Sequence, residues 1–334
     1  MDCPSRRHFL RGGLALAGVG LAAGCGSLPF QSQQPTRVPR VGFLFTGSSG
    51  PSPNVEAFKQ GLRELGYVEG QNVVVEWRYA EGSGDRLRDL AAELAQLPLD
   101  VIVTHAAGVD AAKQASGTIP IVSAVAGDLV GVGHAASLAR PGGNVTGLTN
   151  LAPQLAGKRL ELAKETLPGL SRVALLWNPQ ERAMVLEFGE AKVAAQALGV
   201  QLQSLEVRDA SDFEGAFEVA TGGRVEVLMV VQTVFFIRNR TPIVELAEKS
   251  RLPTVSGDPD FARAGGLIAY GPNIAGMFRQ AATFVDKILK GAKPGELPIE
   301  QPTKFDLVVN LRTAQALTLT IPQSVLVQAT EVIQ

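Results

Sequence analysis

The chain has 334 residues, of which 46% are hydrophobic and 19% charged, and its formal net charge is −1. This composition is typical of a folded globular protein with a sizeable core, and the absence of Lys/Arg clusters beyond the N-terminus argues against binding to nucleic acid. Both cysteines, Cys3 and Cys25, lie in the first 25 residues. The rest of the chain therefore has no thiol for a disulfide, a Cys-ligated metal or a Cys nucleophile.

The N-terminus has the pattern of an export signal. Arg6 and Arg7 precede Phe-Leu and an apolar run that is too short to span the ~30 Å core of a bilayer as a helix. We therefore predict a twin-arginine signal peptide over 1–24. The run ends in small residues before Cys25, as in a lipoprotein cleavage box, so we expect lipidation of Cys25 and a tether over 25–36. Because Ala22 stands where such a box usually has Leu, simple cleavage remains the alternative.

From Val38 the chain alternates predicted strands with predicted helices. The strands are short apolar runs, and the helices carry apolar residues three and four positions apart. In the first half we predict strands 41–45, 73–79, 101–104 and 120–125, and helices 54–65, 85–97 and an alanine-rich helix ending at 116. This alternation is typical of a parallel, doubly wound sheet.

The same pattern begins again after residue 147. We predict helices 155–167, 184–198, 213–220, 243–249, 274–289 and 311–317, and strands 172–177, 200–207, 225–231, 253–256, 266–271 and 304–309. The second half also contains four charged residues that we place on the solvent-exposed face of its first helix, namely Lys158, Arg159, Glu161 and Lys164. A C-terminal segment must then return to both halves.

The fold class that we predict is α/β, with two doubly wound parallel-sheet lobes joined by a hinge. We expect the N-terminal lobe to comprise 37–149 with about 272–302, and the C-terminal lobe 150–271 with about 303–334. Two such sheets side by side create a cleft at the carboxyl ends of their strands, where ligands of open α/β folds bind. An exported protein of this build and size is typical of periplasmic binding proteins, which close by hinge motion.

Six phrases, in this order, resemble the ABC-transporter substrate-binding proteins of the tryptophan/tyrosine-binding type. They are Gly61–Asn72, Ala139–Gly147, Ala264–Gly271, Ile288–Pro294, Leu297–Phe305 and Val309–Ala314. The resemblance runs from about Val38 to the C-terminus. It implies a type I periplasmic-binding-protein fold, an export or lipoprotein signal, and delivery of a solute to a membrane permease.

Polar and small residues follow the predicted strands of the first half. Candidate ligand-binding residues there are Thr46, Ser48, Ser49, Thr104, Ala106, Ala107 and Asp128. Hydroxyl groups, and the free N–H groups at a helix start, favour a carboxylate, and small residues let a ligand approach them. Asp128 could instead pair with a ligand ammonium. Plain turn formation and helix capping explain the same residues equally well.

The second half carries an equivalent set. Its candidates are Asn178, Gln232, Thr233, Phe235, Asp258 and Tyr270. The resemblance implies an Asp where this chain has Thr233, so the ammonium partner of an amino-acid ligand must come from elsewhere, and Asp258 or Asp260 could supply it. Phe235 could stack on a flat ligand or belong to the core, and Tyr270 could face the cleft.

The sequence gives less support to an enzymatic function. The stretch 131–136 has glycines spaced like a dinucleotide loop but lacks a well-placed acid after it. His105 and His134 are too few for a His-rich metal site, and we expect each to be satisfied or exposed. We therefore predict no catalytic residue, no cofactor and no metal.

The function that we predict is the extracytoplasmic solute-binding component of an ABC importer. Its expected partners are a small-molecule solute, with an amino acid or related compound as the candidate, ABC permease subunits, and the membrane through a lipid anchor. We expect a monomer on the outer face of the cell membrane or in the periplasm. The alternatives are an exported Rossmann-like enzyme and a ligand-binding module for a membrane sensor.

Overall fold

The computed structural model describes residues 37–150 and 152–334. The predictions for Arg6, Arg7 and Cys25 lie outside the described residues. Residues 38–334 form one compact unit that contains a five-stranded and a seven-stranded sheet. No helix in the described ranges is both long and apolar enough to cross a membrane.

The first sheet is parallel throughout and has the strand order β2-β1-β3-β4-β5. Its strands are β1 (Arg40–Phe45), β2 (Val74–Tyr79), β3 (Val101–His105), β4 (Ile121–Val125) and β5 (Val145–Gly147). Strands β3 and β4 are buried along their whole length, which explains their continuous apolar runs.

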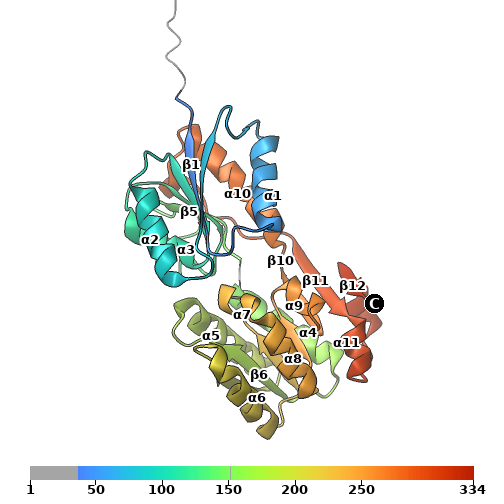
Figure 1. Cartoon of the computed structure of the whole chain (residues 1–334). Helices are drawn as coiled ribbons and strands as arrows, with labels where there is room; N and C mark the ends of the chain where they lie inside the picture. The colour runs from blue at the N-terminus through green and yellow to red at the C-terminus, as the bar shows by residue number, and fades with distance from the viewer. Residues whose placement is uncertain (1–36, 151) are drawn as a thin grey trace, which may run out of the picture. The chain divides into compact units, whose positions relative to one another are not determined.

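Two pairs of helices cover the two faces of this sheet (Figure 1). They are α1 (Pro53–Glu64) with α10 (Ile274–Leu289), and α2 (Gly84–Ala95) with α3 (Ala107–Ala115). Alternate residues of β1 point to different faces: Phe43 joins the core of α1 and α10, and Leu44 joins that of α2 and α3. A helix from late in the chain therefore completes the lobe formed by the first strands.

The second sheet has the strand order β12-β11-β10-β9-β8-β6-β7. Its strands are β6 (Arg172–Trp177), β7 (Gln201–Glu206), β8 (Val227–Val230), β9 (Thr254–Ser256), β10 (Ile268–Pro272), β11 (Phe305–Asn310) and β12 (Glu331–Ile333). Its pairs are parallel except for β10 with β11, which is antiparallel. The sequence pattern did not reveal this reversal.

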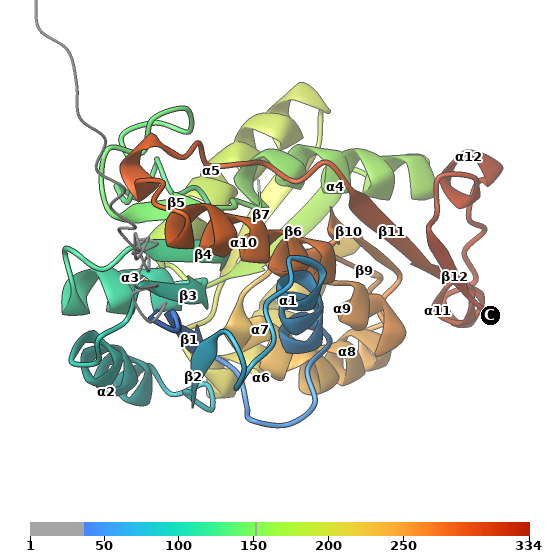
Figure 2. The same ribbon diagram turned by 90° about the horizontal axis from the view of Figure 1, so that it is seen from above.

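The helices of the second lobe are mostly those that the sequence predicts. They are α4 (Ala152–Thr166), α5 (Arg182–Ala197), α6 (Phe213–Gly222), α7 (Val234–Arg238), α8 (Arg240–Lys249), α9 (Pro259–Arg263), α11 (Leu311–Ala316) and α12 (Gln323–Leu326). Helices α4 and α5 lie side by side (Figure 2). The placement of Arg159 on a solvent-exposed face was wrong, because its side chain is 1% exposed.

The chain passes between the two sheets after β5, after β10 and before β11. Two of these segments pair with each other, since Thr149 donates its N–H to the backbone oxygen of Glu300 over 3.1 Å and Glu300 donates to Gly147 over 2.9 Å. Gly147 has φ of +118°, and a Cβ there would overlap the backbone of Ser123, so only glycine fits at the start of the first segment.

Candidate ligand-binding site

Thr46 and His105 join the carboxyl ends of β1 and β3. Nε2 of His105 accepts the backbone N–H of Thr46 over 3.2 Å, and the Thr46 hydroxyl oxygen lies 3.1 Å from the same nitrogen. Burial lowers the pKa of His105 to about 4, so its ring is neutral at pH 7. As the sequence predicted for His105, this is a satisfied histidine, and Thr46 is held to it.

The next predicted group lies where β3 leads into α3. Thr104 is fully buried, and its hydroxyl donates to the backbone oxygen of Leu44 over 2.9 Å. This hydrogen bond links β3 to β1 within the sheet. Ala106 precedes α3 with φ of +47° and ψ of −129°, and Ala107 is the first residue of the helix. No side chain in the described residues caps α3, and Val109 donates its N–H to the backbone oxygen of Ala106 over 3.1 Å, so the N–H groups of Ala107 and Gly108 are the ones that could meet an anion.

Ser48 and Ser49 are exposed and belong to a different contact. Ser49 donates its backbone N–H to Oε1 of Glu81 over 3.1 Å, and hydrogen bonds from both serines lower the pKa of Glu81. Arg238 of α7 donates through Nη1 to the backbone oxygen of Glu81 over 2.7 Å. The structure thus brings these serines to a contact between the two lobes.

Several of the predicted residues form turns or caps. Oδ1 of Asp128 accepts the N–H groups of Val130 and Gly131 over 3.0 and 2.9 Å. In the second lobe, Oδ1 of Asn178 accepts from Gln180 over 2.9 Å, and the hydroxyl of Thr233 caps α7. These are the capping and turn roles that the sequence left as alternatives to ligand contact.

The two aromatic candidates are half-buried and lie against other rings. Phe235 is 5.7 Å from Phe213 and 5.0 Å from Phe236 between ring centroids. Tyr270 stacks on Phe305 at 5.8 Å with an angle of 18° between ring planes. Each ring therefore has part of its surface in the core and part accessible.

Asp258 follows β9 and is 9% exposed. Its Oδ1 accepts the N–H of Asp260 over 3.2 Å, whereas Oδ2 is buried and has no hydrogen-bond partner among the described residues. Burial, with a smaller contribution from Asp260, raises the pKa of Asp258 to about 6. A carboxylate that is costly to ionise and lacks a partner at a strand end is suited to receive a cation.

The sequence missed a buried ion pair beneath the same strand ends. Nη1 of Arg159 on α4 donates to Oε1 of Glu187 on α5 over 2.7 Å, and both side chains are 1% exposed. Burial lowers the pKa of Arg159 and raises that of Glu187, while each charge opposes the shift of the other. The helical spacing gave a signal, because Arg159 lies between Ala156 and Ala163 on the buried stripe of α4.

Gln232 lies beside this ion pair. Its Oε1 is buried without a hydrogen-bond partner among the described residues, although the residue as a whole is only half-buried. A Cβ placed on Gly257 would be 3.1 Å from this oxygen and would collide with the Arg159 guanidinium. Gln232 and Arg159 therefore meet beside Gly257, the residue before Asp258, at the carboxyl ends of β8 and β9.

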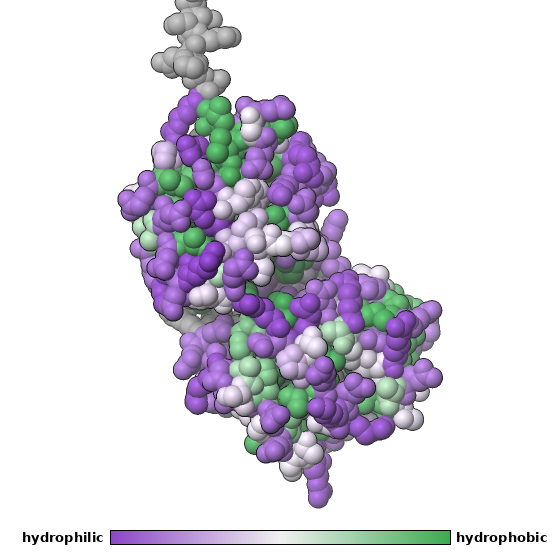
Figure 3. Space-filling view, in the orientation of Figure 1, coloured by the Kyte–Doolittle hydropathy of each residue, from purple (hydrophilic) through white to green (hydrophobic). Residues whose placement is uncertain are grey.

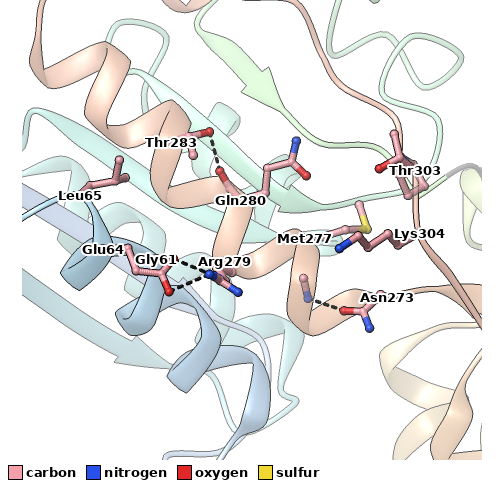
Figure 4. Close-up of a pocket in the computed structure, with 12 residues that line it drawn as sticks. Gly61, Glu64, Leu65, Asn273, Met277, Arg279, Gln280, Thr283, Thr303 and Lys304 are labelled. Atoms are coloured by element: carbon pink, nitrogen blue, oxygen red, sulfur yellow. Dashed lines mark hydrogen bonds and ion pairs between the residues drawn. The ribbon is translucent and has the colours of Figure 1, made fainter.

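A separate pocket of about 440 Å³ lies along α1 and α10 (Figure 4). Arg279 points across it to Glu64, with 2.7 Å between Nη2 and Oε1. Met277 and the segment 302–304 complete its wall, and its lining includes none of the predicted binding residues. In the face shown in Figure 3, hydrophilic side chains dominate and hydrophobic ones are scattered between them.

The chain is similar to a known protein family and to several known proteins. The family model described as "ABC transporter substrate binding protein" matches residues 49–333. A tyrosine-binding protein of Clostridioides difficile is 22% identical over 270 residues, which cover 79% of this chain and 77% of that protein.

Two solved structures are similar over most of this chain. A conserved domain protein of Vibrio cholerae is 27% identical with a TM-score of 0.82, and covers 89% of this chain and 100% of its own. An ABC domain from Streptococcus pneumoniae in complex with L-Trp is 25% identical with a TM-score of 0.82, covering 88% and 99%. These matches confirm the predicted α/β fold with two parallel-sheet lobes.

Proposed function

Because this chain belongs to the family of ABC transporter substrate-binding proteins, we propose that it binds an amino acid between its lobes and delivers it to a membrane permease. The lobes that we propose are 37–149 with about 272–302, and 150–271 with about 303–334. Each contains one of the two sheets, and the segments between them act as the hinge.

The amino-acid class is supported by two of the similar proteins. One is a tyrosine-binding protein, and the other was solved with L-Trp. Such a ligand carries an ammonium and a carboxylate on one carbon atom, so its site needs an acceptor with negative charge beside a group of hydrogen-bond donors.

This proposal rests on Oδ2 of Asp258, which is buried at the end of β9 and has no hydrogen-bond partner within the described ranges. It supplies the charge that Thr233 does not. We assign it to the ligand ammonium. The uncapped N-terminus of α3, after Ala106, supplies donors for the carboxylate from the first lobe.

We also propose how the protein is exported, how it is attached to the membrane and which partners it has. A twin-arginine signal over 1–24 exports the chain, and Cys25 is lipidated and holds the protein at the outer face of the membrane through a tether. The protein works as a monomer with ABC permease subunits and has no chemistry of its own. Thr46, Asn178, Phe235 and Tyr270 surround the ligand at the strand ends.

The experiment is calorimetric titration of the full chain with L-tyrosine and L-tryptophan between pH 5 and 8. The free Asp258 has a pKa of about 6 and must lose its proton to pair with an ammonium. Affinity should therefore rise up to tenfold per pH unit below pH 6 and level off above it. Asp258→Asn should weaken binding at pH 7 and remove this dependence.

A thermal-shift screen against amino acids, nucleosides, organic acids and sugars provides the control. A ligand at ~100 times its dissociation constant adds about 2.7 kcal/mol to the free energy of unfolding, which raises the melting temperature by several degrees. A shift from sugars or nucleosides alone would reject the amino-acid class and leave the family assignment intact.

A further inference from the structure

A buried cluster in the second lobe joins two helices to the ends of three strands. Arg159 is held through Nη1 by Glu187 over 2.7 Å, and its Nε donates to the backbone oxygen of Tyr270 on β10 over 2.9 Å. The third nitrogen, Nη2, is buried and has no hydrogen-bond partner among the described residues. The guanidinium is thus fixed on two sides, and its remaining nitrogen faces the strand ends.

Gln232 and Gly257 lie on that remaining side. A Cβ on Gly257 would collide with Nη2 of Arg159 and lie 3.1 Å from Oε1 of Gln232, so both atoms border the same backbone position. Oε1 of Gln232 is buried on the side of the guanidinium, although it and Nη2 of Arg159 do not hydrogen-bond to each other. The amide nitrogen Nε2 is left on the accessible side.

Charge explains this orientation of the amide. A guanidinium attracts the oxygen of an amide, and it repels the NH₂ group, which carries only donors. Turning the Gln232 amide over would bring two N–H donors against a buried cation, where the low dielectric strengthens the repulsion. Arg159 therefore biases Gln232 to present a donor.

The ion pair between Arg159 and Glu187 is not expected to add much to the free energy of unfolding. Replacing a buried pair by well-packed apolar residues is often neutral or stabilising, because the desolvation cost of two charges offsets their attraction. Arg159 and Glu187 are both 1% exposed, which makes that cost high. The pair lies under the strand ends, beside Gln232 and Gly257.

We propose that Arg159, held by Glu187, is a positioning residue that fixes Gln232 so that Nε2 donates to a carboxylate oxygen of the bound solute. This inference rests on the proposed function, because it requires the solute to bind at these strand ends. The arrangement favours a solute with an anionic acceptor beside its ammonium. A solute with a further N–H donor at that point is rejected, because two donors then face each other.

The test compares L-tyrosine with tyramine, which lacks the carboxylate, by calorimetric titration of the full chain. The measured quantity is the ratio of the two dissociation constants. Gln232→Met should lower the preference for L-tyrosine about tenfold, as expected for one hydrogen bond to a charged group. The double variant Arg159→Met with Glu187→Met should lower it by a similar factor.

Combining the three substitutions distinguishes positioning from independent effects. If Arg159 acts through Gln232, the triple variant loses no more preference than Gln232→Met alone. Ala163→Gly is the matched control, because it loosens the same helix without changing the cluster and should leave the ratio unchanged. Gln232→Glu replaces the donor Nε2 by a carboxylate oxygen and should reverse the preference in favour of tyramine.

Two results would overturn the inference while leaving the proposed function intact. One is a double variant that keeps the wild-type ratio although Gln232→Met lowers it. The other is binding of L-tyrosine with a ratio that neither Gln232→Met nor Gln232→Glu changes. Failure of the wild-type chain to bind any amino acid in the thermal-shift screen contradicts the amino-acid proposal itself, and this inference with it.

Discussion

His105 shows how one side chain fixes the end of a strand. Its Nε2 accepts the N–H of Thr46 over 3.2 Å, and its ring lies 4.7 Å from that of Phe45 and 5.3 Å from that of Phe278. These contacts require a neutral ring, because a protonated Nε2 could not accept a hydrogen bond. The first loop at the strand ends is therefore anchored by an uncharged imidazole.

We predict that His105 makes the fold sensitive to acid. Its folded pKa of about 4 lies below the ordinary value of 6.5, so the unfolded state binds the proton first. Its contribution to stability is complete above pH 6.5 and is lost as pH falls toward 4, by up to about 3 kcal/mol. His105→Gln keeps an acceptor for Thr46 and should lack this loss.

Urea unfolding of both proteins from pH 7.5 to 4.5 checks this prediction. Groups such as Asp258 titrate in both chains, so the difference between the two free energies of unfolding isolates His105. A difference that does not change with pH would show that the imidazole is protonated as easily in the folded chain as in the unfolded one.

For single residues, the sequence predicted the place along the chain better than it predicted which other residues each one contacts. It placed Asp258 and Thr233 after strands, where the structure has them, because apolar runs mark strand ends. It put Arg159 in solvent because a charged residue on an amphipathic helix normally faces water. Its burial depends on two partners that are distant in sequence, Glu187 of α5 and the backbone oxygen of Tyr270.

Among the elements, α1 and α10 approach each other closely at Gly61. A Cβ there would overlap the backbone oxygen of Arg279 and lie 2.9 Å from the Cβ of Ala282. The obstacle is backbone, which cannot move aside as a flexible side chain does. The packing of α1 on α10 therefore depends on the missing side chain.

We predict that Gly61→Ala destabilises the protein by about 1–3 kcal/mol, because the two helices must separate. Gly189→Ala is the matched control. It lies in α5 with nothing within 4 Å of the added Cβ, so it should stabilise by about 0.5–1 kcal/mol through helix propensity. Chemical denaturation of the two variants gives both values, and a stabilising Gly61→Ala would contradict the packing described here.

The sequence predicted most elements, including the three-residue strand β9, but not the direction of β11 and not the strands β5 and β12. Thr233–Phe236 has strand-forming residues, yet the chain forms α7 there because the Thr233 hydroxyl caps a helix. Strands β5 and β12 have three residues each, too few for a periodic pattern, and exist through pairing with β4 and β11. The reversal of β11 is set by the tertiary path of the chain, which local residue patterns do not record.

For the whole molecule, the contact of Arg238 with Glu81 joins the second lobe to the first. Nη1 donates to the backbone oxygen of Glu81 over 2.7 Å, and the guanidinium packs on Gly82, where any Cβ would overlap it. Glu81 and Gly82 both lie in the left-handed region, with φ of +52° and +73°. The contact can form only when the lobes are close together.

We predict that Arg238→Ala weakens binding of every solute by about two- to tenfold without changing selectivity, as expected for one exposed hydrogen bond that favours the closed state. The loss should appear mainly as faster dissociation in stopped-flow measurements. Gly82→Ala should have the same effect, and the double variant should add little to it.

Arg208→Ala is the control for this prediction, because Arg208 makes a surface ion pair with Glu206 inside the second lobe, at 3.7 Å. Its dissociation rate should equal that of the wild type. An unchanged rate in Arg238→Ala would mean that the contact does not contribute to closure.

The path of the chain between the two sheets also sets the order in which the protein can be completed during synthesis. Helix α10 supplies Phe278, Phe284 and Val285 to the core under β1 and β3, yet it leaves the ribosome after β10 of the other lobe. Until then only α1 covers that face of the first sheet. The first lobe therefore cannot finish folding until β10 of the other lobe has been made, and during that interval its partly covered face is open to aggregation or to capture by chaperones.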